Sequence, residues 1–274
     1  MSEHYFTLAT LTGLMKPNHA QSLAWFLDID GTLLDLAASP QAVKVPEELV
    51  VSLDRLARSP YHHVALISGR SLSDIDHLFP NPLLSKSGNH GAEHYCNHEL
   101  WLHRWSRRFL TVRSQVLEGI SALPEQFPGL LVEDKQYSMS IHYRHVDAPQ
   151  HAALANTLKT CLSSVEGIVI HPAKLCWEIR PQPGPTKGDA VKDLSNKVFP
   201  LLPSPVLPVI IGDDRTDEDA FKAISPAITI HVGNNPTQAL YRLNSPHQVR
   251  ELLADVSRDP HFFTHAHSSS EESE

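Results

Sequence analysis

Two carboxylates stand directly after a short apolar run near the start of the chain, and this arrangement constrains the fold more than any other feature. Residues 25–27 form the run, and Asp28 and Asp30 follow it with one residue between them. Such a continuous apolar run is typical of a strand buried on both faces of a parallel sheet, and Gly31 then permits a tight turn. Ligands of these sheets bind beyond the carboxyl ends of the strands, so we expect both acids to face a ligand.

The two acids can divide the work of a phosphoryl transfer. The carboxylate of Asp28 can attack phosphorus as a nucleophile. Asp30 can give a proton to the leaving oxygen and later take one from water. The pair therefore predicts phosphate chemistry at the end of a buried strand.

A second apolar run and a lysine supply groups that bind phosphate. Residues 63–67 lead into Ser68, Gly69 and Arg70, whose hydroxyl and guanidinium groups suit phosphoryl oxygens. Lys187 opens a helical pattern, so its charge lies beside a helix N-terminus, where anions are favoured.

A third apolar run, residues 208–211, ends in acids. They are Asp213, Asp214 and Asp217. Carboxylates around a phosphate repel it unless a hard divalent cation lies between them, so Mg²⁺ is implied. The acids could instead form a solvated helix start, but their position after a strand and a glycine favours the catalytic interpretation.

The spacing of these segments indicates a doubly wound, mostly parallel α/β core with an inserted α+β cap domain. The stretch between Ser68 and Lys187 is too long for one crossover and has helical spacing at 106–127 and 149–165. Residues 129–144 and 167–180 each predict two strands. We expect this cap to close over the active site. The expected parts are a loosely structured lead-in (1–21), the core (22–105 and 183–262), the cap (106–182) and a disordered tail (263–274).

The cap is where the substrate's alcohol should be recognised, since a core that transfers phosphate carries little information about it. Glu133 and Lys135 lie two residues apart on a strand and share one face, and Glu178 lies on another cap strand. These charges suit sugar hydroxyls. The alternative is a solvated face with a surface ion pair.

The four core motifs, in this order, resemble those of the haloacid-dehalogenase superfamily of aspartyl-phosphate phosphatases. Further segments resemble signatures of the trehalose-6-phosphate phosphatases, namely residues 89–93, 133–135, 142–144 and 177–181. This resemblance implies Mg²⁺-dependent hydrolysis of trehalose 6-phosphate to trehalose and phosphate through an aspartyl-phosphate intermediate.

The same resemblance implies a role for each matching residue. Asp28 would be the nucleophile and Asp30 the general acid and base. Mg²⁺ would be held by Asp28, the backbone carbonyl of Asp30, and Asp213, with Asp214 and Asp217 as supports. Catalysis would also use Ser68, which binds the phosphoryl group, and Lys187, which holds Asp28. The implied substrate-binding residues are Gly69, Arg70, Asn89, His90, Glu93, Glu133, Lys135, Arg144 and Glu178, of which Glu133, Lys135 and Glu178 would contact the glucose ring distal to the phosphate.

Composition limits the other partners. The chain has 23 basic and 31 acidic residues, and its formal charge of −8 argues against binding to nucleic acid or anionic membranes. Its three cysteines are few and lack metal-type spacing, as expected for free thiols in a reducing compartment. Without a secretory pattern or a membrane-spanning apolar stretch, we expect a cytoplasmic protein, a monomer or weak dimer, whose partner is a small-molecule sugar phosphate.

Three alternatives stand beside this interpretation. His90, His94 and His98 recur every four residues and on a helix could line a metal site, but Gly91 and the following pattern favour a hairpin. The function could instead be hydrolysis of a sucrose or mannosyl phosphate, or sugar-phosphate binding by a non-catalytic regulator. The intact pair of acids argues against a regulator, which needs no nucleophile.

Overall fold

The computed structural model describes residues 5–16, 18–36, 43–173 and 175–259, which form two compact units. The core unit comprises Met1–Trp101 and Thr186–Glu274, and the inserted unit comprises Leu102–Pro185. The sequence predicts the ends of the insertion at residues 106 and 182. The expected disordered tail lies outside the described residues.

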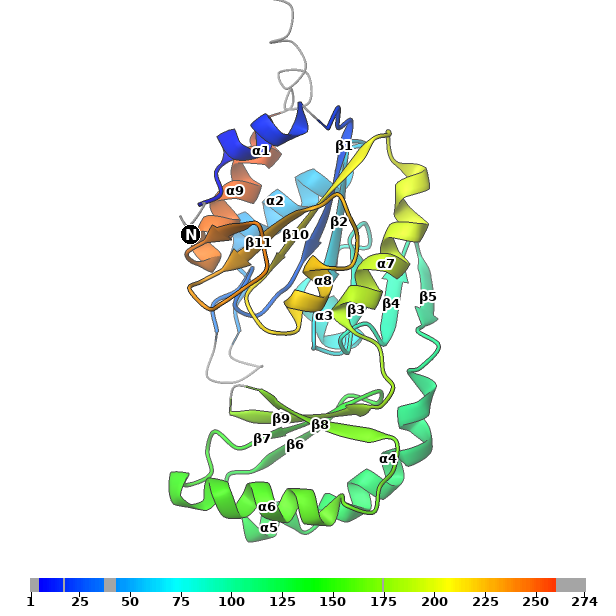
Figure 1. The fold of residues 1–274 in the computed structure, drawn as a ribbon, viewed down its shortest axis with the longest axis vertical. Coiled ribbons are helices and arrows are strands. Elements are labelled where there is room, and N and C mark those ends of the chain that lie inside the picture. Colours follow the sequence, from blue (N-terminus) through cyan, green and yellow to red (C-terminus); the bar gives the residue numbers. More distant parts are fainter. Residues whose placement is uncertain (1–4, 17, 37–42, 174, 260–274) are drawn as a thin grey trace, which may run out of the picture. The chain divides into compact units, whose positions relative to one another are not determined.

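The core unit is built on an eight-stranded sheet (Figure 1). Its parallel strands are β1 (Ser22–Leu27), β2 (His62–Ile67), β3 (Ser85–Gly88), β10 (Val206–Gly212), β11 (Ile228–Val232) and β12 (Tyr241–Leu243). At one edge β4 (Glu93–Cys96) runs antiparallel to β3, and β5 (Glu99–Leu102) follows it. The order is β12-β11-β10-β1-β2-β3-β4-β5, so β1 lies between the two strands that lead into the other acidic and hydroxyl motifs.

Helices cover both faces of this sheet, because the side chains of its strands alternate between two apolar layers. In β1, Leu23, Trp25 and Leu27 join one layer, and Ala24 and Phe26 join the other. The first layer also takes side chains from α1 (Leu8–Met15), α2 (Glu47–Arg58), α3 (Leu72–Leu78) and α9 (Pro246–Arg258). The second takes them from α7 (Lys187–Val198) and α8 (Asp217–Phe221). The predicted doubly wound α/β core is confirmed.

The N-terminal segment differs from the expectation of a loosely structured lead-in. It contains the helix α1, whose cap Thr7 accepts a hydrogen bond from the backbone N–H of Thr10 at 3.1 Å. Leu11 and Met15 are completely buried in the first apolar layer. A helix of eight residues is not stable alone, so tertiary packing rather than local propensity explains its presence.

The segment with three regularly spaced histidines forms the predicted hairpin and not a helix. Asn97 and His98 connect β4 to β5 with φ angles of 51° and 63°, as a two-residue hairpin turn of type I′ requires. His94 is buried and stacks on the ring of Trp101 at 5.0 Å. Within the described ranges, no metal-type cluster includes these histidines.

The inserted unit is a four-stranded antiparallel sheet with helices on one face. Its strands are β6 (Leu131–Asp134), β7 (Met139–His142), β8 (Ile168–Ala173) and β9 (Cys176–Pro181), in the order β6-β7-β9-β8. Its helices are α4 (Arg107–Ile120), α5 (Leu123–Gln126) and α6 (His151–Cys161), with a 3₁₀ turn at Ala148–Gln150. The single helix expected over 106–127 is therefore two, and the second begins with Pro124 in its first turn, where a missing N–H is tolerated.

The two faces of this smaller sheet differ in chemistry. Met139, Ile141 and Ile179 lie on the face that packs with Phe109 of α4 and Leu154 of α6. Alternate positions of the same strands carry Glu133, Ser140, His142, Cys176, Glu178 and Arg180. We call this second surface the polar face of the inserted unit. The apolar face holds the unit together, which leaves the polar face available for binding.

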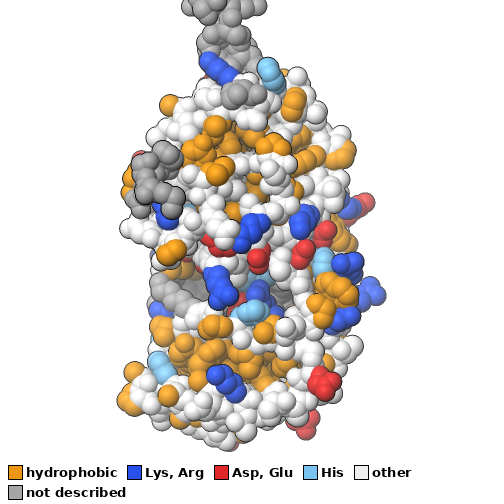
Figure 2. Space-filling view, in the orientation of Figure 1, with side chains coloured by type: hydrophobic (Ala, Val, Ile, Leu, Met, Phe, Trp, Pro, Cys, Tyr) orange, Lys and Arg blue, Asp and Glu red, His pale blue; other side chains and the backbone are white. Residues whose placement is uncertain are grey.

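The surface shows no strong separation of charge in the view of Figure 2. Acidic and basic side chains are intermixed on this face of the core unit. None of the helices in the described ranges is both long and apolar enough to cross a membrane.

Replacing His62 with glutamine should make the free energy of unfolding less sensitive to acid. His62 is buried and accepts a hydrogen bond from Nε1 of Trp25 at 3.2 Å, and burial lowers its pKa to about 4. Folding therefore opposes its protonation, and its contribution to stability is lost as pH falls from about 6.5 toward 4. At pH 5 this penalty is about 2 kcal/mol.

The measurement is the free energy of unfolding by denaturant at pH 7.5 and pH 5. From pH 7.5 to pH 5, wild type should lose about 2 kcal/mol more of its free energy of unfolding than His62→Gln does. His77→Gln, at an exposed position on α3, serves as the control. A difference that does not change with pH would contradict this account.

Candidate active site

Parallel strands bring the predicted acids and hydroxyl to one edge of the core sheet. Leu27, the last residue of β1, lies in register with Ile211 of β10 and Leu66 of β2. The backbone N–H of Asp28 continues this pairing with a 3.0 Å hydrogen bond to the carbonyl of Ile211. The residues that follow the three strands therefore emerge together, as predicted for ligand sites of such sheets.

Lys187 lies at the centre of the acids. It begins α7, whose N-cap Thr186 forms a capping box with Asp189. Its Nζ donates to Oδ1 of Asp28 at 2.6 Å and to Oδ1 of Asp217 at 2.8 Å, and the residue is only 3% exposed. Burial disfavours the ammonium, but the carboxylates of Asp217 and Asp28 outweigh burial and raise the pKa of Lys187 well above its ordinary value. The lysine is therefore a fixed positive charge.

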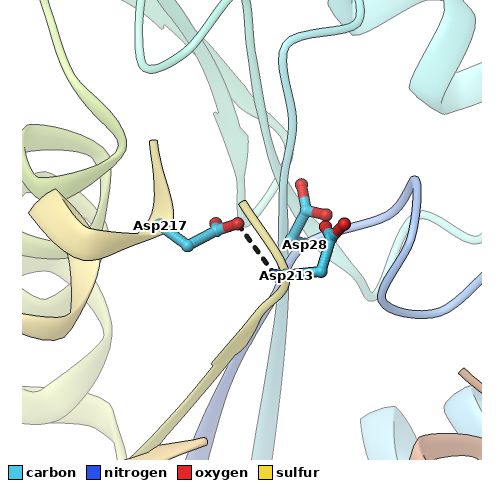
Figure 3. A group of neighbouring side chains, drawn as sticks. All are labelled: Asp28, Asp213 and Asp217. Carbon is cyan, nitrogen blue, oxygen red and sulfur yellow. Dashed lines mark hydrogen bonds between the residues drawn. The ribbon is translucent and has the colours of Figure 1, made fainter. Parts of the chain in front are cut away.

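Asp28 and Asp213 point their carboxylates toward one another, while Asp217 reaches in from α8 (Figure 3). One oxygen from each of the three lies within 4.8 Å of the others. The carboxylate of Asp217 is already bonded, to Lys187 through Oδ1 and to the backbone N–H groups of Asp213 and Asp214 through Oδ2, both at 3.1 Å. Asp217 therefore shapes the site, and Asp28 and Asp213 are the better candidates for direct metal ligands.

The site carries more negative charge than its lysine can balance. Burial raises the pKa of Asp28 to about 7, although Lys187 opposes the shift. Burial and the neighbouring Asp217 raise the pKa of Asp213 to about 7. Three crowded carboxylates with one ammonium and only oxygen donors fit a hard divalent cation, which would favour their charged forms.

Glycines allow these carboxylates to approach the backbone. Gly31 has a φ of 92°, and a Cβ there would overlap the carboxylate of Asp213. A Cβ on Gly212 would overlap the side chain of Asp217. Thr32, which had no assigned role, donates from Oγ1 to Oδ1 of Asp213 at 3.3 Å. Any side chain at either glycine would therefore displace an acid.

The guanidinium of Arg70 binds Asp30 rather than being available to a ligand. Its Nε and Nη2 donate to the two carboxylate oxygens of Asp30, each at 2.6 Å. Such a bidentate pair fixes the plane of the carboxylate. The structure thus brings together two residues that the sequence analysis assigned to different tasks. Coordination of a metal by the Asp30 carbonyl stays a prediction.

Ser68 is held at the end of β2 by the neighbouring strand β3 and by its own loop. Its N–H donates to the carbonyl of Ser87 at 2.9 Å, and its Oγ accepts from the N–H of Arg70 at 3.2 Å. His90 packs over Gly69, where a Cβ would lie 2.5 Å from the imidazole Nε2. The hydroxyl is therefore fixed in place at the same edge of the sheet as Asp28.

Asn89 and Glu93 bond to each other and to the same loop. Nδ2 of Asn89 donates to Oε1 of Glu93 at 2.7 Å, and the N–H of Leu72 donates to that oxygen at 2.8 Å. The N–H of Asn89 donates to the carbonyl of Arg70 at 2.7 Å. These contacts brace the loop that carries Ser68 and Arg70, whereas direct contact of Asn89 and Glu93 with a substrate stays a prediction.

The inserted unit places two of its three predicted sugar-binding residues in contact. Nζ of Lys135 lies 3.7 Å from Oε2 of Glu133. Glu178 on β9 lies beside Ser140 on the neighbouring strand β7, and Ser140 lies beside Glu133 on β6. Arg144 is exposed, with no hydrogen bond or ion pair to another described residue.

His142 has no role predicted from the sequence. Its Nε2 lies 2.8 Å from Oε2 of Glu133. The signal that could have found it is the alternation of side chains on a strand, which puts His142 on the same face as Ser140. Asp35, also without an assigned role, pairs with Arg250 of α9 at 3.2 Å.

A family model described as trehalose-phosphatase matches residues 26–247. The chain belongs to this family. The trehalose-6-phosphate phosphatase of Escherichia coli is 31% identical over 83% of this chain and 84% of its own length. Trehalose 6-phosphate phosphatase RA3 of Zea mays is 28% identical over 94% of this chain and 76% of its own.

Solved structures agree with this assignment. A trehalose-6-phosphate phosphatase related protein superposes with a TM-score of 0.73 at 26% identity, over 85% of this chain and 96% of its own. The C-terminal domain of the Candida albicans trehalose-6-phosphate phosphatase gives 0.78 at 23% identity, over 93% and 98%. The solved structures share the fold, and the chain is a phosphatase.

Proposed function

We propose that this phosphatase hydrolyses trehalose 6-phosphate to trehalose and inorganic phosphate through an aspartyl-phosphate intermediate. The observation that carries the proposal is the buried carboxylate of Asp28, bonded to Lys187 and converging with Asp213 at the end of β1. The named relatives from Escherichia coli and Zea mays support the choice of substrate.

In the first step the Asp28 carboxylate attacks phosphorus, and the bond between phosphorus and the sugar oxygen breaks. Lys187 holds Oδ1 of Asp28 and so orients the carboxylate for this attack. Asp30 gives a proton to the leaving sugar oxygen and then takes one from the water that attacks the phosphoaspartate, which releases phosphate. In the resting site Arg70 orients the ionised carboxylate of Asp30.

Asp28 and Asp213, with the backbone carbonyl of Asp30, would hold Mg²⁺. Bound Mg²⁺ supplies positive charge against the phosphoryl oxygens. Asp214 and Asp217 would orient this set, and Ser68 would donate its hydroxyl to the phosphoryl group. Two segments are proposed to surround the phosphate, namely Gly69 and Arg70 after β2, and Asn89, His90 and Glu93 between β3 and the start of β4.

We also propose that the polar face of the inserted unit binds the glucose ring distal to the phosphate. Glu133, Lys135 and Glu178 would accept and donate hydrogen bonds to its hydroxyls, with Arg144 as a further contact. Lys135 has only 9% of its side chain exposed, and Glu178 only 16%, so both charges are partly removed from water. Hydrogen bonds made there are stronger than those of a fully solvated ion pair.

The direct test is phosphate release from a panel that contains trehalose 6-phosphate, sucrose 6-phosphate, glucose 6-phosphate and p-nitrophenyl phosphate, each with Mg²⁺. The proposal expects the largest kcat/KM for trehalose 6-phosphate. A larger kcat/KM for another sugar phosphate would identify that compound as the substrate instead. Binding without turnover of any of them would favour a regulatory protein.

Removing Lys135 or Glu178 should weaken catalysis on the sugar substrate and not on a small one. Lys135→Met or Glu178→Gln deletes hydrogen bonds to a charged group, worth about 1.5–3 kcal/mol each. We expect kcat/KM for trehalose 6-phosphate to fall by roughly 10- to 150-fold. Part of the loss should appear in kcat, since remote binding energy can drive catalysis.

Hydrolysis of p-nitrophenyl phosphate, which has no distal sugar, should change little in the same variants. Lys159→Met, at an exposed position of α6, is the matched control. Equal losses on both substrates would mean that Lys135 and Glu178 support folding or catalysis in general. No loss on either substrate would mean that Lys135 and Glu178 belong to a solvated face with a surface ion pair.

A further inference from the structure

His142 occupies a central place on the polar face of the inserted unit, yet no step proposed so far uses it. It is the last residue of β7 and lies opposite Cys176 of β9. On the other side its Nε2 lies 2.8 Å from Oε2 of Glu133 on β6. His142 therefore links the two strands that carry the proposed sugar-binding acids, Glu133 and Glu178.

We propose that His142 is a positioning residue, which fixes the carboxylate of Glu133 so that it can accept a hydrogen bond from a sugar hydroxyl. The inference rests on the proposed function, because it assumes that Glu133 contacts the substrate.

His142 contacts that carboxylate more closely than Lys135 does. Lys135 lies 3.7 Å from Oε2 of Glu133, which is a loose ion pair, whereas the 2.8 Å contact of His142 with the same oxygen is a hydrogen bond. The imidazole therefore fixes the orientation in which we propose that the carboxylate meets the sugar.

Its neighbours favour the charged form of the imidazole. Hydrogen bonds with the thiol of Cys176 and with Glu133 raise the pKa of His142 to about 9, although burial opposes the shift. The thiol also lies 3.5 Å from the carbonyl of Trp177, to which it can donate. An imidazolium donates from both nitrogens, so it can bind the thiol sulfur and the carboxylate at once.

The arrangement lies outside the apolar core of the inserted unit, and Glu133 and His142 keep 27% and 24% of their side chains exposed. A carboxylate that is already fixed and reachable from solvent loses less entropy when a sugar binds.

Four substitutions, one pair of them also combined, test the proposal. His142→Leu removes the donor, and His142→Gln keeps an N–H donor near the position of Nε2. His145→Leu is the matched control, at an exposed position three residues further on. Glu133→Gln, alone and combined with His142→Leu, tests whether His142 acts through Glu133. The readouts are KM and kcat for trehalose 6-phosphate and kcat/KM for p-nitrophenyl phosphate.

We expect His142→Leu to lower kcat/KM for trehalose 6-phosphate about tenfold, mainly through KM, with p-nitrophenyl phosphate unchanged. His142→Gln should recover most of this loss. In the Glu133→Gln background, His142→Leu should have almost no further effect.

Three results would overturn the proposal. They are equal values for His142→Leu and His145→Leu, the same loss on both substrates, and an undiminished effect of His142→Leu in the Glu133→Gln background. If wild type does not hydrolyse trehalose 6-phosphate, the proposed function is wrong. The same four variants, measured on the best sugar phosphate of the panel, then still decide the role of His142.

Discussion

Asp28→Asn should lower kcat for trehalose 6-phosphate by roughly 10³-fold or more, because an amide cannot replace a carboxylate as the nucleophile. Asp30→Asn should be nearly as severe, since it removes the group that exchanges protons with the leaving oxygen and with water. The measurement is phosphate release at saturating substrate. Turnover at the wild-type rate by Asp28→Asn would end the covalent mechanism.

Loss of the fold should not accompany the loss of activity in Asp28→Asn. Asp28 and Asp217 are buried carboxylates that share Lys187, and burial raises the pKa of Asp28 to about 7. Folding therefore opposes the charge of Asp28, and its removal relieves repulsion within the cluster. We expect the Tm measured without Mg²⁺ to stay the same or to rise. Asp35→Asn, an exposed site paired with Arg250, is the control that should keep full activity.

Chelation of divalent cations should abolish phosphate release from trehalose 6-phosphate, and Mg²⁺ should restore it. The reason is the excess of negative charge around the position of the phosphate, which Lys187 alone does not balance. Zinc should not be required, because the cluster offers only oxygen donors. Full activity in excess chelator would contradict the predicted metal site.

Asp213→Asn separates metal binding from general loss of function. Mg²⁺ should raise the Tm of the wild-type protein, since a ligand that binds only the folded state stabilises it. It should not raise the Tm of Asp213→Asn, whose activity should be lost or should need far more Mg²⁺. Asp219→Asn, on the exposed side of α8, should respond to Mg²⁺ as wild type does. An equal Mg²⁺ response in Asp213→Asn would remove Asp213 from the metal site.

Local sequence was enough to predict the edge of the sheet where the acids meet. Apolar runs that end in Asp28, Ser68 and Asp213 predict buried parallel strands, and in such a sheet the carboxyl ends of neighbouring strands coincide. The hairpin turn at Asn97 and His98 also depends on local sequence, because two adjacent residues determine it.

The sequence was less informative where an element depends on distant packing. The helix α1 is short and exists because Leu11 and Met15 are buried against the core sheet. The helical pattern over 106–127 appeared continuous, but the chain forms α4 and α5 with a turn between them. Periodicity alone does not show such a break within an apolar pattern.

By itself, then, the sequence determined the order of the motifs, the class of the fold and the residue types at the site, because these follow from local hydrophobic pattern and from chemistry that each residue carries alone. Only the tertiary structure decided the pairings: Arg70 with Asp30, Asp217 with Lys187, and His142 with Glu133. Each pair joins residues on different strands, helices or loops. Their contact depends on how the chain folds, which no local pattern records.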